Sequence, residues 1–186
     1  MRVISGKYKH RHFDVPHAFK ARPTTDFAKE NLFNILQNVY VDFDDHPSVL
    51  DLFAGTGSMS LEFLSRGCGK VVSVEKDYKH YQFIRHVARE IGDPQWTVVM
   101  GDVFKYIQHC HDTFDIIFAD PPYALSTIAD LPVTMLESGL LAPGGLFILE
   151  HGKTNDFSTN PHLIDHREYG SVNFSFFQFQ REEEDG

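Results

Sequence analysis

The chain has 186 residues, of which 42% are hydrophobic, and a formal net charge of −9. This length predicts one domain with a sizeable core, and no apolar run approaches the roughly 18 residues that a membrane span needs. The first residues lack the apolar core of a signal peptide, and Cys68 and Cys110 are not in CxxC spacing. We therefore expect a cytoplasmic protein without a metal site or a disulfide framework.

Residues 1–22 favour a short β-hairpin or an extended arm. Arg2–Ser5 and His12–Val15 are strand-like, and Gly6 lies between them. The segment is rich in Lys and Arg, whereas the last six residues are mostly acidic. A basic arm on an acidic body can follow phosphates locally, but a merely solvated edge is the alternative that charge alone leaves open. We expect the acidic tail to be a solvated end.

The loop 22–26 precedes a predicted helix, which Thr25 or Asp26 can cap. The residues expected on the apolar side of this helix are Phe27, Leu32, Phe33, Leu36 and Val39. No exposed apolar stripe is evident along the chain, which favours a monomer.

After an acidic linker, strand and helix patterns alternate. The strand-like runs are 48–53, 70–75, 95–100, 115–119 and 145–150, and the helical patterns fall near 57–66, 77–91, 102–109 and 126–138. Repeated β–α units with apolar strands predict an α/β fold with a mostly parallel sheet covered on both faces. The segments 163–169 and 172–179 predict an antiparallel pair, and adjacent Phe176 and Phe177 indicate a bulge or a change of face.

Residues 49–58 predict a strand that enters a glycine turn and opens a helix. Gly55 and Gly57 permit a tight turn, so that the N–H groups at the helix start can face a ligand. A dinucleotide-binding motif would have a third glycine where this chain has Ser60. Asp51 before the turn would repel a pyrophosphate but suits an ammonium or a ribose hydroxyl. A plain helix-capping turn is the alternative.

Four acids lie at the ends of four successive predicted strands, namely Asp51, Glu75, Asp102 and Asp120. At its position Glu75 can accept both ribose hydroxyls of a nucleoside cofactor. Asp102 can accept an adenine amino group, although a plain helix N-cap is the commoner role for such an Asp. Because the carboxyl ends of parallel strands meet at one edge, we expect the four acids to line one crevice.

The segment Asp120-Pro121-Pro122-Tyr123 follows a buried strand. Asp120 can accept a hydrogen bond from an amino group, and Tyr123 can stack on a planar ring. The two prolines fix the backbone around them. The segment therefore suits an exocyclic amine on a nucleobase, with a Pro-rich turn as the alternative.

The fold pattern, D-L-F-A-G-T-G and D-P-P-Y resemble the class I methyltransferases that use S-adenosyl-L-methionine (AdoMet) on exocyclic amines. The segments 2–6, 22–26, 30–34 and 169–170 resemble the RsmD family, which methylates guanine N2 in bacterial 16S ribosomal RNA. The resemblance implies a Rossmann-like fold with a seven-stranded, mostly parallel sheet and an antiparallel C-terminal strand. It also implies an N-terminal β-hairpin arm over 1–22 and a methyltransferase domain over 23–186.

The resemblance implies AdoMet as the cofactor and, as the partner, 16S rRNA within an assembling or assembled small subunit. The residues then expected at the cofactor are Asp51, Phe53, Ala54, Gly55, Thr56, Gly57, Glu75, Lys76, Asp102, Val103 and Asp120. Those expected at the reacting amine are Asp120, Pro121, Pro122 and Tyr123. Those expected to contact RNA are Arg2, Lys7, Lys9, Arg11, Arg22 and Thr24. The acidic pI of about 5.6 departs from what an RNA enzyme usually shows.

Three alternatives remain at this point. An N6-adenine methyltransferase shares D-P-P-Y, but 186 residues leave no room for an extra target-recognition region. An NAD-dependent oxidoreductase is disfavoured by Ser60 and Asp51. A catalytically silent RNA-binding module is disfavoured by the complete set of strand-end acids.

Overall fold

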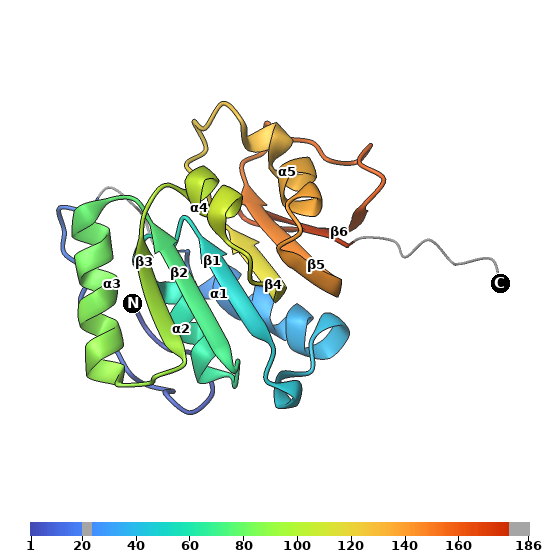
Figure 1. Cartoon of the computed structure of the whole chain (residues 1–186). Coiled ribbons are helices and arrows are strands. Elements are labelled where there is room, and N and C mark those ends of the chain that lie inside the picture. The colour runs from blue at the N-terminus through green and yellow to red at the C-terminus, as the bar shows by residue number, and fades with distance from the viewer. Residues whose placement is uncertain (20–23, 179–186) are drawn as a thin grey trace.

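The computed structural model describes residues 1–19 and 24–178, which form an α/β fold with helices on both faces of a central sheet (Figure 1). The strands are β1 (Ser48–Leu52), β2 (Lys70–Glu75), β3 (Trp96–Met100), β4 (Phe114–Ala119), β5 (Leu141–His151), β6 (Leu163–Tyr169) and β7 (Val172–Phe177). Their order is β3-β2-β1-β4-β5-β7-β6, and only β7 runs antiparallel to its two neighbours. The predicted Rossmann-like sheet of seven strands, with its antiparallel C-terminal pair, is confirmed.

The helices divide into two layers. They are α1 (Asp26–Ile35), α2 (Ser58–Ser65), α3 (Tyr78–Ile91), α4 (Val103–His109) and α5 (Leu131–Glu137). The buried side chains of α1, α2 and α3 pack in one core and those of α4 and α5 in another, on opposite faces of the sheet. Val49 and Leu50 of β1 belong to different cores, as expected for a parallel strand buried on both sides. No helix among the described residues is long and apolar enough to cross a membrane.

The first helix begins as predicted, with the Thr25 hydroxyl accepting the Ala28 N–H. The prediction that Phe27 and Val39 lie on its apolar side is wrong, because Phe27 is 64% exposed and Val39 is 62% exposed. Phe27 lies in the first turn, off the buried stripe of α1. Val39 lies in a π-helical turn over 36–40, whose wider winding changes the direction in which side chains point.

The N-terminal arm does not form the two strands of the predicted β-hairpin. One antiparallel bridge joins Arg2 to His12, supported by a 3.0 Å hydrogen bond from the Val3 N–H to the Arg11 carbonyl. A further bond runs from the His10 N–H to the Val3 carbonyl at 3.3 Å, and beyond it the Ile4 and Ser5 N–H groups donate to the Glu62 carboxylate of α2.

Gly6 allows the arm to approach α2 closely. It has a positive φ of 91°, and a Cβ at this position would lie 1.9 Å from the Ser65 carbonyl oxygen. Just beyond it, the Lys7 N–H donates to that same carbonyl at 2.8 Å. The arm is thus fixed along α2 by backbone contacts that a larger residue would prevent.

The bulge predicted at the two adjacent phenylalanines lies opposite them, in the partner strand β6, and not in β7 itself. Phe176 belongs to the core under α1–α3 and Phe177 to the core under α4–α5, so a regular strand buries both. The pairing of β7 with β5 has no register shift, and the bulge lies in β6 between Leu163 and Asp165. Phe179 and the acidic tail lie outside the described residues.

Candidate active site

Five acidic side chains lie at the carboxyl edge of the sheet. Asp51 and Glu75 are in the last two residues of β1 and β2, Asp102 and Asp120 come after the ends of β3 and β4, and Glu150 lies near the end of β5. A small cavity of about 60 Å³ opens between the ends of β1 and β4. Its lining includes Asp51, the glycine turn, Asp120 and Thr24, but neither Glu75 nor Asp102, so this cavity holds two of the four acids that were expected to line one crevice. No group of three metal-ligating side chains that could hold an ion was found in residues 1–19 and 24–178.

A larger cavity of about 700 Å³ lies elsewhere, between the segment 37–44, Ser5 and Arg66. None of the strand-end acids lines it. Because ligands of open α/β sheets bind at the carboxyl ends of the strands, the smaller cavity is the better candidate for the centre of a site.

The glycine turn after β1 positions Asp51 and the start of α2. Phe53, Gly55 and Gly57 all have positive φ, of 58°, 60° and 77°, so the chain reverses within a few residues. Asp51 is almost fully buried and accepts two hydrogen bonds from Ser60, from the N–H at 3.1 Å and from the hydroxyl at 2.6 Å. Burial raises the pKa of Asp51 to about 7 despite these bonds.

Ser60, which replaces the third glycine of a dinucleotide motif, belongs to a buried polar chain. Its hydroxyl lies 2.5 Å from that of Ser73 on β2, and the Trp96 indole N–H donates to Ser73 at 2.9 Å. These hydrogen bonds connect β3, β2 and α2 and end on the Asp51 carboxylate. We infer that Ser60 holds this carboxylate in place.

The Glu75 carboxylate is held by two backbone groups. One oxygen accepts the Gly55 N–H at 2.6 Å and the other accepts the Asp77 N–H at 2.9 Å. A carboxylate has about four acceptor positions, so each oxygen keeps one for a ligand hydroxyl. Glu75 therefore links the glycine turn to the end of β2 and can still bind a ribose.

Asp102 has the N-cap role that was the alternative to ligand binding. One of its oxygens accepts the N–H groups of Phe104 and Lys105 at the start of α4. The other oxygen lies 3.9 Å from the exposed Lys76 ammonium. This second oxygen leaves room for contact with an amine. Val103 is buried in the α4–α5 core, so only its backbone could meet a cofactor.

The Asp-Pro-Pro-Tyr loop lies against Glu150. Tyr123 is half exposed, and its hydroxyl donates to one Glu150 oxygen at 3.4 Å, while Thr24 donates to the other at 3.1 Å. The Tyr123 ring packs on Gly152, where an added Cβ would lie 3.2 Å from the ring. Burial, and then repulsion by the Glu150 and Asp51 carboxylates, raises the pKa of Asp120 well above its usual value.

The two proline carbonyls of this loop differ in their partners. The Pro122 carbonyl accepts the Leu125 N–H at 2.9 Å. Within the described part of the chain, no donor takes the Pro121 carbonyl. An acceptor next to Asp120 is therefore available to a substrate, and the exposed face of Tyr123 lies two residues away.

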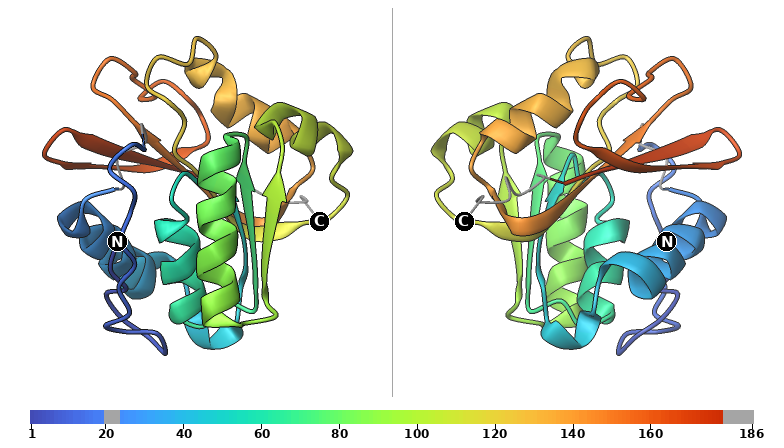
Figure 2. Two further views of the ribbon diagram at one scale, coloured as in Figure 1. Left: turned by 90° about the vertical axis from the view of Figure 1, so that its left-hand side faces the viewer. Right: turned by 90° about the vertical axis from the view of Figure 1, so that its right-hand side faces the viewer.

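The predicted RNA contacts are not gathered in one place. Arg2 pairs with Asp26 at 3.1 Å on the surface. The Lys7 ammonium lies 2.7 Å from Asp93, which follows α3 at the amino edge of the sheet, opposite the acids. Figure 2 shows the dark blue arm reaching towards the end of the molecule at which α3 ends. Lys7 is thus an anchor of the arm and does not adjoin the acid cluster.

Lys9 and Arg11 lie exposed on the same arm, and Arg22 lies outside the described residues. Thr24, predicted to contact RNA, instead lines the cavity and binds Glu150. Sequence reasoning missed Glu150 altogether, although it ends the predicted strand 145–150 and follows the same rule as the four acids that were found.

Comparison with known proteins places this site in context. The family model described as Conserved hypothetical protein 95 matches residues 1–178. The chain is 31% identical to the ribosomal RNA small subunit methyltransferase D of Escherichia coli strain K12, covering 98% of this chain and 90% of that protein. It is 28% identical to the protein of the same name from Haemophilus influenzae, covering 96% and 93%. A solved hypothetical protein of Thermus thermophilus superposes with a TM-score of 0.82 at 30% identity, covering 96% and 99%.

Proposed function

The chain belongs to the family described as Conserved hypothetical protein 95, the RsmD type of class I methyltransferases, and from this membership we propose its reaction. We propose that it transfers a methyl group from AdoMet to the exocyclic N2 amine of a guanine in 16S ribosomal RNA. The observation that carries this proposal is the pair of acceptors at the Asp-Pro-Pro-Tyr loop. The Asp120 carboxyl and the Pro121 carbonyl, which accepts no hydrogen bond from the described residues, lie beside the half-exposed ring of Tyr123.

An exocyclic amine is a poor nucleophile because its lone pair is delocalised into the ring. Two acceptors on its hydrogens favour a pyramidal nitrogen and direct the lone pair at the methyl group, which AdoMet supplies in activated form. Asp120 and the Pro121 carbonyl would accept these hydrogens while Tyr123 stacks on the base. Positioning and preorganised polar groups then do most of the catalysis. The target base must be unstacked from its neighbours, either by flipping or because it lies in a loop of the RNA.

The remaining acids fit the cofactor. Glu75 would bind the ribose hydroxyls, the second oxygen of Asp102 would accept the adenine amine, and Asp51 would face the methionine ammonium. The turn 53–57 would enclose the methionine part, with Lys76 beside the adenine and ribose. This arrangement uses the lone pairs that the protein's own backbone leaves free at Glu75 and Asp102.

Glu75→Ala is expected to weaken the binding of S-adenosylhomocysteine by about 1–3 kcal/mol, because a charged acceptor of two ribose hydroxyls is lost. Isothermal titration calorimetry measures this change. Glu90→Ala, which removes an exposed carboxylate on α3, is the control and should bind like the wild type. Equal affinities of Glu75→Ala and the wild type would remove Glu75 from the cofactor site.

Glu150→Gln is expected to shift the acid limb of the pH–rate profile to lower pH. Tyr123 and Thr24 donate to different oxygens of Glu150, so the single amide oxygen of Gln can accept from one of them while its NH2 group donates to the other hydroxyl. The substitution removes the negative charge that helps to raise the pKa of Asp120. The pKa of Asp120 then falls, and Asp120 stays ionised in more acidic solution. Methyl transfer measured across a range of acidic and alkaline buffers tests this, with exposed Glu168→Gln as the control. An unshifted profile would show that Glu150 acts on the loop only through packing.

Mapping of methyl groups in ribosomal RNA by mass spectrometry, in cells with and without the gene, tests the proposed substrate. Loss of one N2-methylguanine from 16S RNA is expected. Loss of an N6-methyladenine would establish the nearest alternative instead. The purified protein offered naked 16S RNA or small subunits would then show which of the two it accepts.

The RNA-binding part of the proposal rests on the exposed cations of the arm, Lys9 and Arg11, together with Arg22. Arg2 and Lys7 contribute less, because Asp26 and Asp93 already pair with them. Local basic charge of this kind attracts phosphates even when the net charge of the protein is negative.

A further inference from the structure

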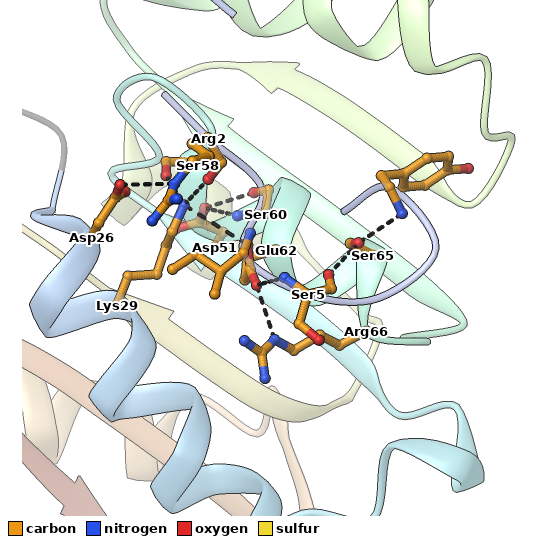
Figure 3. A network of polar contacts seen from close by, with 12 residues as sticks. Arg2, Ser5, Asp26, Lys29, Asp51, Ser58, Ser60, Glu62, Ser65 and Arg66 are labelled. Carbon is orange, nitrogen blue, oxygen red and sulfur yellow. Dashed lines mark hydrogen bonds and ion pairs between the residues drawn. The ribbon is translucent and has the colours of Figure 1, made fainter. Parts of the chain in front are cut away.

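Lys29 is a lysine of α1 with only 2% of its surface exposed. Its ammonium donates to the Arg2 carbonyl at 2.7 Å and to the Ser58 hydroxyl at 2.9 Å, as Figure 3 shows. It thereby joins the arm and α1 to the first residue of α2. Burying an ammonium is unfavourable unless something compensates its charge.

The surroundings of Lys29 carry an excess of positive charge. Its nearest carboxylate is Glu62, at 3.8 Å, but Glu62 also pairs with the buried Arg66 at 3.0 Å. The same carboxylate accepts the Ile4 and Ser5 N–H groups (Figure 3). Two buried cations therefore share one buried anion. Burial lowers the pKa of Lys29, and the charges of Glu62 and, less strongly, Asp26 only partly oppose this, because Arg2 and Arg66 act in the same direction as burial.

Ser58 lies between the Lys29 ammonium and the cavity. It is 6% exposed and lines the cavity together with Asp51, Thr56 and Asp120. Its oxygen accepts from Lys29, so its single hydrogen must point elsewhere, and no acceptor for it lies within residues 1–19 and 24–178. The N–H groups of Ser58 and Met59 likewise have no acceptor in the described part of the chain.

The other charged groups of the cavity are acids. Asp51 and Asp120 line it directly, and the Glu150 carboxylate adjoins Asp120. They suit an ammonium, a sulfonium or an amine and would repel a carboxylate. The start of α2 is the part of the cavity where unused N–H and O–H donors and a neighbouring positive charge coincide. An anionic group of a ligand is favoured at that end alone.

We propose that Ser58 and Lys29 form the binding site for the carboxylate of the methionine part of AdoMet. The Ser58 hydroxyl and the first N–H groups of α2 donate to the carboxylate. Lys29 orients that hydroxyl, and its positive charge compensates the negative charge of the carboxylate from the far side of Ser58. Asp51, on the opposite side of the glycine turn, takes the ammonium. This inference rests on the proposed function, because it assumes AdoMet as the ligand.

Calorimetry with two ligands that differ by one carboxylate tests the inference. The probes are AdoMet and decarboxylated AdoMet. The wild type should bind AdoMet more tightly. Lys29→Met and Ser58→Ala should weaken AdoMet by about 10–100-fold and about 3–10-fold respectively, as for a charged and a neutral hydrogen-bonding group. Their affinity for decarboxylated AdoMet should stay unchanged, so the variants should lose the preference for AdoMet over decarboxylated AdoMet that the wild type shows.

Ser65→Ala is the matched control, because it removes a serine hydroxyl from the same helix at the end away from the cavity. It should keep the wild-type preference. If Lys29→Met does not fold, Ser58→Ala decides alone, since it removes one hydroxyl and leaves Lys29 bound to Arg2.

Two results would overturn the inference while leaving the proposed function intact. One is a wild-type preference that both variants retain. The other is an equal loss of affinity for the two ligands, which would assign Lys29 and Ser58 a purely structural role. A wild type that binds neither ligand would instead refute the proposed function, and this inference with it.

Discussion

Asp120→Ala is expected to reduce the rate of methyl transfer by about three orders of magnitude, close to complete loss. Asp120 is the acceptor that would hold one hydrogen of the target amine, and its backbone N–H is fixed to the Leu52 carbonyl at 3.3 Å. Because the acceptor acts on the amine as it becomes pyramidal, its loss should appear in the rate constant for chemistry. Single-turnover transfer of a labelled methyl group to 16S RNA measures it.

The binding of S-adenosylhomocysteine should survive the same substitution within a few-fold. Glu75 and the glycine turn remain in place, and removing one of the clustered carboxylates relieves repulsion among the rest. Asp130→Ala, an exposed acid before α5, is the control and should keep full activity. If Asp120→Ala turns over at more than a tenth of the wild-type rate, Asp120 does not hold the amine, and the Pro121 carbonyl and Tyr123 carry the site.

Much of this fold follows from periodicity that a single sequence displays. The apolar runs that became β1, β2, β4 and β5 are mostly buried on both faces, which favours a covered, mostly parallel sheet, whereas the edge strand β3 is partly exposed. Thr25 caps α1 because a hydroxyl there can reach the N–H three residues on. Asp51, Glu75, Asp102 and Asp120 lie along one edge of the sheet for a related reason. Position at a strand end determines which edge a side chain occupies.

Contacts between distant segments were not predictable in this way. Nothing local indicates that Lys29 lies against Ser58, or that Glu62 accepts the N–H groups of Ile4 and Ser5. The charge of Lys7 suggested RNA, but the Asp93 that neutralises it is 86 residues away. Charge along the sequence shows how many cations a segment has. Only the packed structure shows which of them remain free.

Asp51→Asn is expected to stabilise the ligand-free protein at pH 8 while it weakens AdoMet binding. Burial raises the pKa of Asp51 from 3.8 to about 7, so the folded protein binds this proton more tightly than the unfolded chain does. The stability from that proton is complete below pH 3.8 and is lost as pH rises through 7. By pH 8 the loss approaches on the order of 4 kcal/mol, because a tenfold difference in proton affinity between the two states corresponds to about 1.4 kcal/mol.

Asparagine keeps an oxygen for both Ser60 donors and never ionises, so the gain in unfolding free energy should be a few kcal/mol at pH 8 and smaller at pH 5. Thermal unfolding at the two pH values measures it, with exposed Asp130→Asn as the control for the loss of one negative charge. A variant less stable than the wild type at pH 8 would show that the Asp51 charge is compensated inside the free protein. If unfolding free energy is gained, the buried charge of Asp51 destabilises the ligand-free protein, and the ammonium of the ligand compensates that charge. Wild-type affinity for AdoMet should then rise with pH through about 7, and that of Asp51→Asn should not.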